Sequence, residues 1–208
     1  TLWHIQETQL IDNIVTIEIN NDTLESYGQW PFPRNVLAHE IRKLYDHGAG
    51  LVILPMLLAE PDRFGMDADF TKMLAETPTI IGQVPGKVQK GNPVTRGVSA
   101  IGVPWEGWLY KYPEAIGPLK EFADAAIGVG MLVISPEADG VVRRVPLAVD
   151  INGEIYPSMS MEIIRTASGD VSYQIKTGEA GVEALRIPKY GITKTDPNGN
   201  IWVDFQYK

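Results

Sequence analysis

Few side chains in the sequence are of the kinds that catalyse reactions or hold metal ions. The chain has three histidines and no cysteine, which excludes thiolate metal sites, disulfides and a cysteine nucleophile. His39 and Glu40 begin an H-E-x-x-H pattern, but Lys43 stands where the second histidine is needed. His39 and His47 lie roughly 12 Å apart along a helix, too far to share a metal ion. We therefore expect no catalytic residue, no metal site and no cofactor.

Carboxylates are more plentiful, and three of them gather before and at the start of a predicted helix. They are Asp62, Asp67 and Asp69. Acidic residues at this place usually cap the helix and complement its dipole. We favour that interpretation over a metal site.

The run Trp30-Pro31-Phe32-Pro33-Arg34 combines two prolines, two aromatic rings and a cation. The prolines restrict the backbone, and the rings anchor it to an apolar surface. Arg34 sits where a helix should begin, so its charge opposes the helix dipole and needs a carboxylate or a bound anion nearby. A structural ion pair is the favoured explanation, and ligand contact by Trp30 and Arg34 is the alternative.

A second run, from Asp139 to Pro146, turns at Asp-Gly and then carries two adjacent arginines. On a strand, Arg143 and Arg144 must point to opposite faces, so one is solvated and the other needs a partner. Structural pairing is again favoured over ligand binding.

Glu60 follows a predicted strand, where open α/β sheets place their ligands. We expect Glu60 to face a crevice and to pair with Arg34 or Arg143.

The segment 84–112 is rich in glycine, proline and aromatic residues, and we interpret most of it as a long excursion. Trp105 and Trp108 lie in it, and the segment is the natural lid or partner surface. The alternative is a loop that simply packs over the sheet.

The pattern around these residues predicts alternating strands and helices. Strands are expected at 14–19, 51–54, 79–83, 130–134, 141–149 and 201–205, and helices at 33–48, 67–76, 116–126 and 158–166. Asn152-Gly153 predicts a hairpin. Residues 21–23 are a capping or turn signal and predict a short helical turn to Tyr27. After a turn at 136–140, the strand at 141–149 should return antiparallel to the strand at 130–134. The first strand, helix and second strand should form a parallel β-α-β unit. The fold class is α/β, a single domain over residues 1–208 with a mixed, mostly parallel sheet flanked by helices and antiparallel hairpins in the C-terminal half.

Composition narrows the class of partner. The net charge is −8 over 208 residues, which argues against nucleic acid and against an anionic membrane surface. The longest apolar runs reach about half of the roughly 20 residues that a membrane helix needs. The chain begins at Thr1 without an initiator methionine, and we expect it to be excised from a longer protein.

Taken in order, these elements resemble the CHASE-type extracytoplasmic sensory domains of the second type. The resemblance rests on residues 30–34, on the strand that ends in Glu60-Pro61-Asp62, and on residues 139–146, and it covers about residues 14–205. It implies the sensor of a bacterial transmembrane receptor, outside the cytoplasmic membrane, between an N-terminal membrane helix and a group of C-terminal ones. The output implied is an adenylate or guanylate cyclase, a diguanylate cyclase, a histidine kinase or a serine/threonine kinase.

The sequence departs from the family pattern in three places. Asn20 stands where members commonly have an acidic residue, and Leu54-Pro55 replaces a Phe-Asp pair. A carboxylate-lined pocket is thus partly lost, and Pro55 should end or bulge its strand. The chain stops at Lys208 before the family's further strand and helix, so either the piece was cut short or the receptor is unusual. An incomplete sheet would expose an edge for pairing with a second copy.

The sequence therefore predicts a non-catalytic, periplasmic or cell-surface sensor for an unknown small molecule or protein, tethered to the membrane in the full-length protein. Two alternatives are an α/β hydrolase-like enzyme that uses acidic residues and a purely structural dimerisation module. The predicted ligand-binding residues are Trp30, Arg34, Glu60, Trp105, Trp108, Arg143 and Arg144.

Overall fold

The computed structural model describes residues 13–134 and 136–203, and the chain divides into two compact units. Of the first unit, the structure describes residues 13–32. The second unit runs from Pro33 to Val203. The fold class is mixed α/β, as the sequence predicts.

In the first unit, the short helix α1 (Asn21–Tyr27) confirms the predicted helical turn. Asn20 caps it, because its side chain accepts from the backbone N–H of Thr23 at 3.1 Å. The strand predicted at 14–19 is wrong: those residues form no strand, and Val15 is 77% exposed. A β-branched run favours an extended backbone, but it becomes a strand only where another strand offers hydrogen bonds.

The parallel sheet of the second unit is built around β2 (Thr79–Gly86). β2 pairs in parallel with β1 (Val52–Leu57) and β6 (Gly128–Met131), and antiparallel with β5 (Glu114–Ile116). Since residues 14–19 contribute no strand, the β-α-β unit predicted there is replaced by β1, a helix and β2. The register of β1 shifts between Leu54 and Leu57, which confirms the bulge expected at Pro55.

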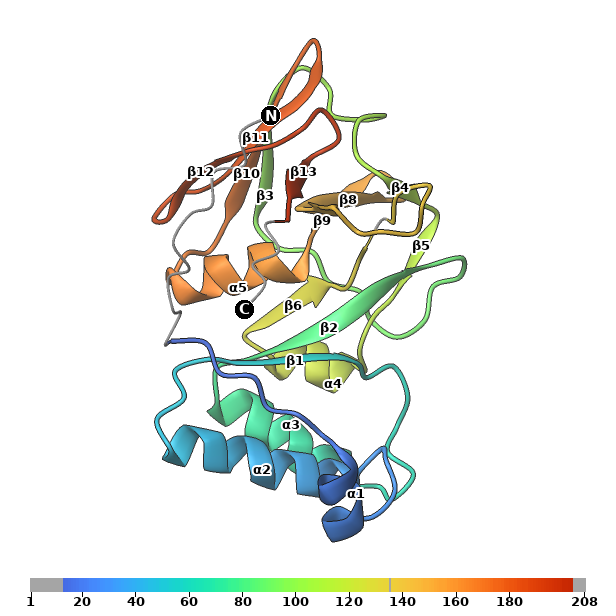
Figure 1. Cartoon of the computed structure of the whole chain (residues 1–208), viewed down its shortest axis with the longest axis vertical. Coiled ribbons are helices and arrows are strands. Elements are labelled where there is room, and N and C mark those ends of the chain that lie inside the picture. Colours follow the sequence, from blue (N-terminus) through green and yellow to red (C-terminus); the bar gives the residue numbers. More distant parts are fainter. Residues whose placement is uncertain (1–12, 135, 204–208) are drawn as a thin grey trace. The chain divides into compact units, whose positions relative to one another are not determined.

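Helices lie on both faces of this sheet (Figure 1). α2 (Arg34–Asp46), α3 (Asp67–Glu76) and α4 (Lys120–Ala125) lie on one side, and α5 (Met159–Ala167) lies on the other. The rings of Phe70 and Phe122, both fully buried, meet edge to face at 5.1 Å and join α3 to α4. The bounds of α3 match the prediction. α4 is shorter than the helix expected at 116–126, because Ile116 belongs to β5 and residues 117–119 form no helix.

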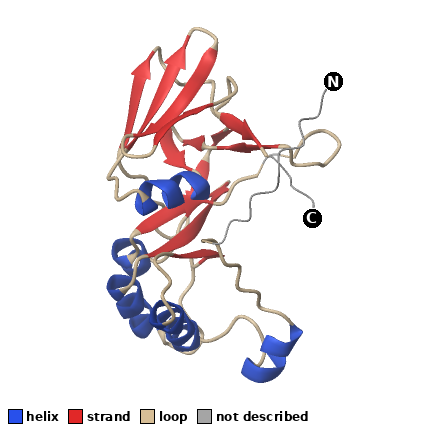
Figure 2. Ribbon diagram, turned by 60° about the vertical axis from the view of Figure 1, so that its left-hand side comes forward, coloured by secondary structure: helices blue, strands red, loops and turns tan. Residues whose placement is uncertain are grey.

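The remaining strands form smaller sheets beyond α5 (Figure 2). One sheet has the order β12-β11-β10-β3, one is β4-β8-β9, and one is β13-β7. Their bounds are β3 Val98–Gly102, β4 Lys111–Tyr112, β7 Arg144–Pro146, β8 Ala148–Ile151, β9 Glu154–Pro157, β10 Tyr173–Gly178, β11 Gly181–Ile187, β12 Gly191–Lys194 and β13 Asn200–Trp202. Met161 of α5 packs in one buried cluster with Tyr173, Ile175 and Leu185 of β10 and β11, so α5 joins the two parts of this unit.

The sequence predictions for this region have different outcomes. The hairpin at Asn152-Gly153 is confirmed: both residues have positive φ, 50° and 89°, and they connect β8 to β9. The expected return of 141–149 against the strand at 130–134 is wrong, because β7 pairs with β13 and β8 pairs with β9. The long excursion is also not free of strands, since it contains β3 and β4. The last predicted strand is observed as β13, and its expected end at 204–205 lies outside the described residues.

Candidate functional site

A cleft of about 360 Å³ opens beside the edge of β3. Its walls come from the approach to β3, from the turn after that strand and from the start of β9. The lining residues are Thr95, Arg96, Gly97, Val98, Ala100, Trp105, Glu154 and Ile155. Of the residues predicted to bind a ligand, Trp105 is the one that lines this cleft.

Hydrogen bonds to neighbouring elements fix the wall that leads into β3. Gln83, fully buried on β2, forms a two-way amide pair with the backbone of Val94, at 2.7 and 2.9 Å. Thr95 donates from its hydroxyl to the carbonyl of Ile155. Arg96 donates from Nη2 to the carbonyl of Ala123 at 2.8 Å. These bonds hold the backbone on either side of the cleft in a defined position before any ligand arrives.

A buried hydroxyl lies next to this wall. Tyr173 on β10 is fully buried, and within the described residues its hydroxyl has no hydrogen-bond partner. Burial raises its pKa well above the ordinary value, while the neighbouring Thr95 side chain acts in the opposite direction. Tyr173 therefore places a buried polar group next to Thr95, which lines the cleft.

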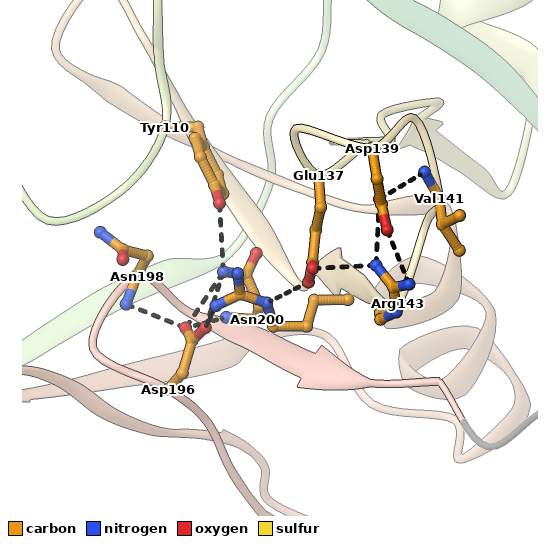
Figure 3. Close-up of polar contacts among 9 residues, drawn as sticks. Tyr110, Glu137, Asp139, Val141, Arg143, Asp196, Asn198 and Asn200 are labelled. Atoms are coloured by element: carbon orange, nitrogen blue, oxygen red, sulfur yellow. Dashed lines mark hydrogen bonds and ion pairs between the residues drawn. The ribbon is translucent and has the colours of Figure 1, made fainter.

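The two predicted arginines meet on a shared carboxylate (Figure 3). Arg143 Nη1 lies 3.1 Å from Glu137 Oε2, and Arg144 Nε lies 3.2 Å from Glu137 Oε1. Asp139 accepts two further bonds from Arg143, at 3.0 and 2.8 Å. The expectation that the arginines point to opposite faces is wrong. β7 begins only at Arg144, so Arg143 is not held by strand geometry.

Asp196 is the second centre of this cluster. It accepts from Arg144 Nη1 at 3.1 Å, from the backbone N–H groups of Asn198 and Asn200, and from the side-chain amide of Asn200. Figure 3 shows the amide of Asn200 also reaching the hydroxyl of Tyr110, at 3.4 Å. The cluster thus ties the turn before β13 to β7 and to Tyr110. We call the set Glu137, Asp139, Arg143, Arg144, Asp196 and Asn200 the arginine cluster.

A single turn connects the cleft to the arginine cluster. The backbone N–H of Trp108 donates to the carbonyl of Trp105 at 3.2 Å, which closes the turn. The carbonyl of Trp108 then accepts from the side-chain amide of Asn198 at 2.8 Å. Trp105 and Trp108 both pack against the buried cluster around Tyr173. This confirms packing of the loop onto a sheet and leaves one face of Trp105 to the cleft.

The other predicted site residues lie elsewhere. Arg34 Nε lies 3.8 Å from Asp67 Oδ1, and its guanidinium lies 5.8 Å from the Phe70 ring centre. Burial lowers the pKa of Arg34, and the nearby carboxylates of Asp67 and Asp62 oppose this. The carboxylate partner expected for Arg34 is therefore present. Trp30, in the first unit, meets Phe32 edge to face at 5.2 Å.

The expected partners of Glu60 are wrong. Its carboxylate pairs with Lys90 at 2.5 Å, not with Arg34 or Arg143, and its side chain is 74% exposed. The hydrogen bond from Lys90 lowers the pKa of Glu60. Arg34 pairs with Asp67 on its own side of the sheet, and Arg143 is occupied by Glu137 and Asp139.

Sequence reasoning missed four charged residues of these sites: Arg96, Glu154, Glu137 and Asp196. Glu137 and Asp196 both lie in segments that the sequence marks as turns, which is a signal that their side chains were free to pair. Arg96 and Glu154 carry no comparable signal, since the structure brings them together through β3 and the hairpin of β8 and β9.

The pairing of Asp139 gives a direct test of the cluster. Its pKa falls from 3.8 to about 2, because Arg143 donates hydrogen bonds to it and the backbone N–H of Val141 adds another. A lowered pKa stabilises the fold above pH 4, and that contribution is lost as the pH falls toward 2. In a carboxyl NMR titration we expect a midpoint near 2 for Asp139, and a higher one in Arg143→Gln that stays below 3.8 because the bond from Val141 remains. Lys176→Gln on β10 is the control and should leave the midpoint unchanged. A midpoint near 4 in the unmodified chain would contradict the pairing.

In residues 13–134 and 136–203, no three His, Asp or Glu side chains are grouped closely enough to hold a metal ion. None of the helices described is both long and apolar enough to cross a bilayer.

Comparison with protein-family models matches residues 1–208 to the CHASE2 domain. No curated protein and no solved structure matches the chain.

Proposed function

Since the chain belongs to the CHASE2 domain family, whose members are extracytoplasmic sensory domains, we propose that it senses a ligand for a bacterial transmembrane receptor. CHASE2 sensor domains are generally non-catalytic. We propose that the receptor's output is a cyclase or a kinase on the cytoplasmic side. We propose the cleft at Trp105 as the ligand site and the arginine cluster as the link toward the membrane.

The turn from Trp105 to Tyr110 is the observation that carries this proposal. Its first residue lines the cleft, and the carbonyl of Trp108 and the hydroxyl of Tyr110 bond to Asn198 and Asn200. A ligand that shifts Trp105 therefore acts on β13 and on the turn before it, through one hydrogen bond to each. In the family's arrangement, the chain beyond this strand leads toward the membrane.

The mechanism is a shift between two conformers. A ligand moves such an equilibrium only if it binds one conformer more tightly than the other. We propose that the element with two arrangements is the bonding of Arg144, which here joins Glu137 before β7 to Asp196 before β13. Closing the cleft around Trp105 would favour one arrangement of these partners.

The experiment uses membranes that contain the full-length gene product. Membranes are incubated with labelled ATP and GTP, with or without the small-molecule fraction of spent culture medium. Cyclic nucleotides, cyclic diguanylate and phosphoprotein are then measured. We expect one of these products to change in amount on addition, and Trp105→Ala to abolish the change. Lys176→Ala, which alters an exposed residue on β10, should respond like the unmodified protein.

Arg144→Gln separates binding from transmission. It removes the bonds to Glu137 and Asp196 while the cleft keeps all its lining residues. We expect this variant to lose the response as Trp105→Ala does. A response of unchanged size in both variants, or no responding product in the unmodified protein, would contradict the proposal.

A further inference from the structure

Opposite charges stand in the cleft without neutralising one another. Arg96 and Glu154 are the charged residues among those that line it. Within the part of the chain that the structure describes, neither forms an ion pair, and Glu154 accepts no hydrogen bond with its carboxylate. A zwitterion carries one negative and one positive charge. An unpaired cation and an unpaired anion in one small cleft complement these two charges.

The guanidinium of Arg96 makes one hydrogen bond within the described residues and keeps other donors for a ligand. One of its terminal nitrogens donates to the carbonyl of Ala123 at 2.8 Å, which anchors that end of the group. A guanidinium has five N–H donors in a rigid fork, so most of them remain for an anionic group. The geometry of the fork suits a carboxylate, which it binds through two parallel bonds.

Glu154, which also lines the cleft, supplies the complementary charge. It opens β9 directly after the Asn152-Gly153 turn, and it is exposed. The hairpin is rigid because Gly153 donates from its backbone to Asp150 Oδ1 at 2.7 Å. A primary ammonium group is a compact donor that a single carboxylate accepts well.

The cleft also has apolar lining residues. Val98, Ala100 and Ile155 line the cleft together with the indole of Trp105. Trp105 packs on the buried cluster around Tyr173, so its ring is a fixed platform. A volume of about 360 Å³ is at the small end of ligand sites.

We infer that the cleft binds a small zwitterion, with its carboxylate on Arg96, its ammonium group on Glu154 and an apolar or aromatic body against Trp105. This inference rests on the proposed function, because it names the ligand class of the same cleft. It predicts that a ligand with both charges binds more tightly than a ligand with only one of them.

The test compares four probes by isothermal titration calorimetry on the full chain. L-phenylalanine carries both charges, 3-phenylpropanoate only the negative one, 2-phenylethylamine only the positive one, and 2-phenylethanol neither. Each charged contact should strengthen binding about tenfold. We expect L-phenylalanine to bind about tenfold more tightly than either singly charged probe, and the neutral probe to bind most weakly.

Variants assign each charge to its residue. Glu154→Gln should weaken L-phenylalanine about tenfold and leave 3-phenylpropanoate unchanged. Arg96→Gln should weaken L-phenylalanine and 3-phenylpropanoate but not 2-phenylethylamine, and Arg96→Lys should restore part of the loss. Glu183→Gln and Arg186→Gln, exposed on β11, are the matched controls and should bind as the unmodified chain does.

Two outcomes overturn the inference. One is that L-phenylalanine binds no more tightly than the singly charged probes, and the other is that none of the four probes binds at millimolar concentration. The receptor assay keeps the proposed function separate. If Trp105→Ala and Arg144→Gln abolish the response while no zwitterion binds, the ligand class is wrong and the sensing role stands.

Discussion

Glu162→Gln is expected to lower the free energy of unfolding by about 3–5 kcal/mol. Glu162 on α5 is 2% exposed, and it accepts from Arg165 Nε at 2.8 Å and from Nη2 at 2.6 Å. Neutralising it leaves the buried guanidinium of Arg165 without its hydrogen-bonded carboxylate. Gly128 packs so closely on this carboxylate that an added Cβ would lie 2.7 Å from Oε1. The structure around it therefore cannot relax easily.

The loss should extend over several elements. Arg165 also donates to the carbonyls of Asp170 and Ile127, at 2.7 and 3.4 Å, so the pair joins α5 to the residues before β6 and before β10. Urea unfolding followed by circular dichroism measures the change. The matched control is Asp124→Asn, which breaks the exposed pair with Lys120 on α4, at 2.7 Å. That control should cost less than about 1 kcal/mol.

A double variant makes the test independent of the folding of the single one. Replacing both Glu162 and Arg165 by methionine removes the two charges together, and apolar replacement of a buried pair is often neutral. We expect it to recover most of the stability that Glu162→Gln loses. If Glu162→Gln costs no more than Asp124→Asn, the pair contributes little and the argument fails.

The elements that sequence reasoning placed well are those set by local rules. The bounds predicted for α3 are the observed ones because apolar spacing and an acidic first turn define a helix within ten residues. Asn152-Gly153 specifies its hairpin because both residues tolerate positive φ. Pro55 disturbs β1 because it lacks an N–H to donate.

The errors come from pairing between distant segments. Residues 14–19 have the composition of a strand, yet Val15 and Ile17 are 77% and 62% exposed, since composition does not supply a neighbouring strand. β3 was not predicted, because it lies in a glycine-rich segment. It forms a strand because β10, more than 70 residues away, pairs with it in parallel. Neither fact is encoded in a window of ten residues.

The candidate site shows the same division. Arg143 and Arg144 stand out in the sequence because adjacent cations on a strand need partners, and Trp105 because it lies in an aromatic loop. Their partners could not be identified, since Arg144 meets Asp196 across 52 positions of sequence. The error about opposite faces arose from the place where β7 begins, which depends on its pairing with β13.

Asp196→Ala is expected to cost about 2–3 kcal/mol, because it strips acceptors from several donors at once. Asn200 is 1% exposed, and its backbone N–H and side-chain amide both donate to Asp196, at 2.9 and 3.1 Å. Arg144 loses one of its two carboxylates. The buried amide of Asn200 then keeps only a long bond to Tyr110, at 3.4 Å.

The effect should be greatest at β13. Asn200 opens that strand and pairs with Pro146 of β7, so loss of the turn before it loosens the strand's first bonds. Hydrogen exchange at residues 200–202 measures this local opening, and urea unfolding measures the whole. The stability of Asp196→Asn should lie between that of the unmodified chain and that of Asp196→Ala. An amide oxygen still accepts from the backbone, but Arg144 loses the negative charge that Asp196 supplied.

Asp139→Ala is the control from the same cluster. It removes two bonds to Arg143, but Asp139 is exposed and water replaces them. We therefore expect only a marginal loss of stability and no change in exchange at β13, although Arg143 sits beside Arg144. If Asp139→Ala and Asp196→Ala were equally destabilising, the cluster would act as a diffuse surface of charges. A large difference, concentrated at β13, means that Asp196 holds the strand through which we propose the signal leaves.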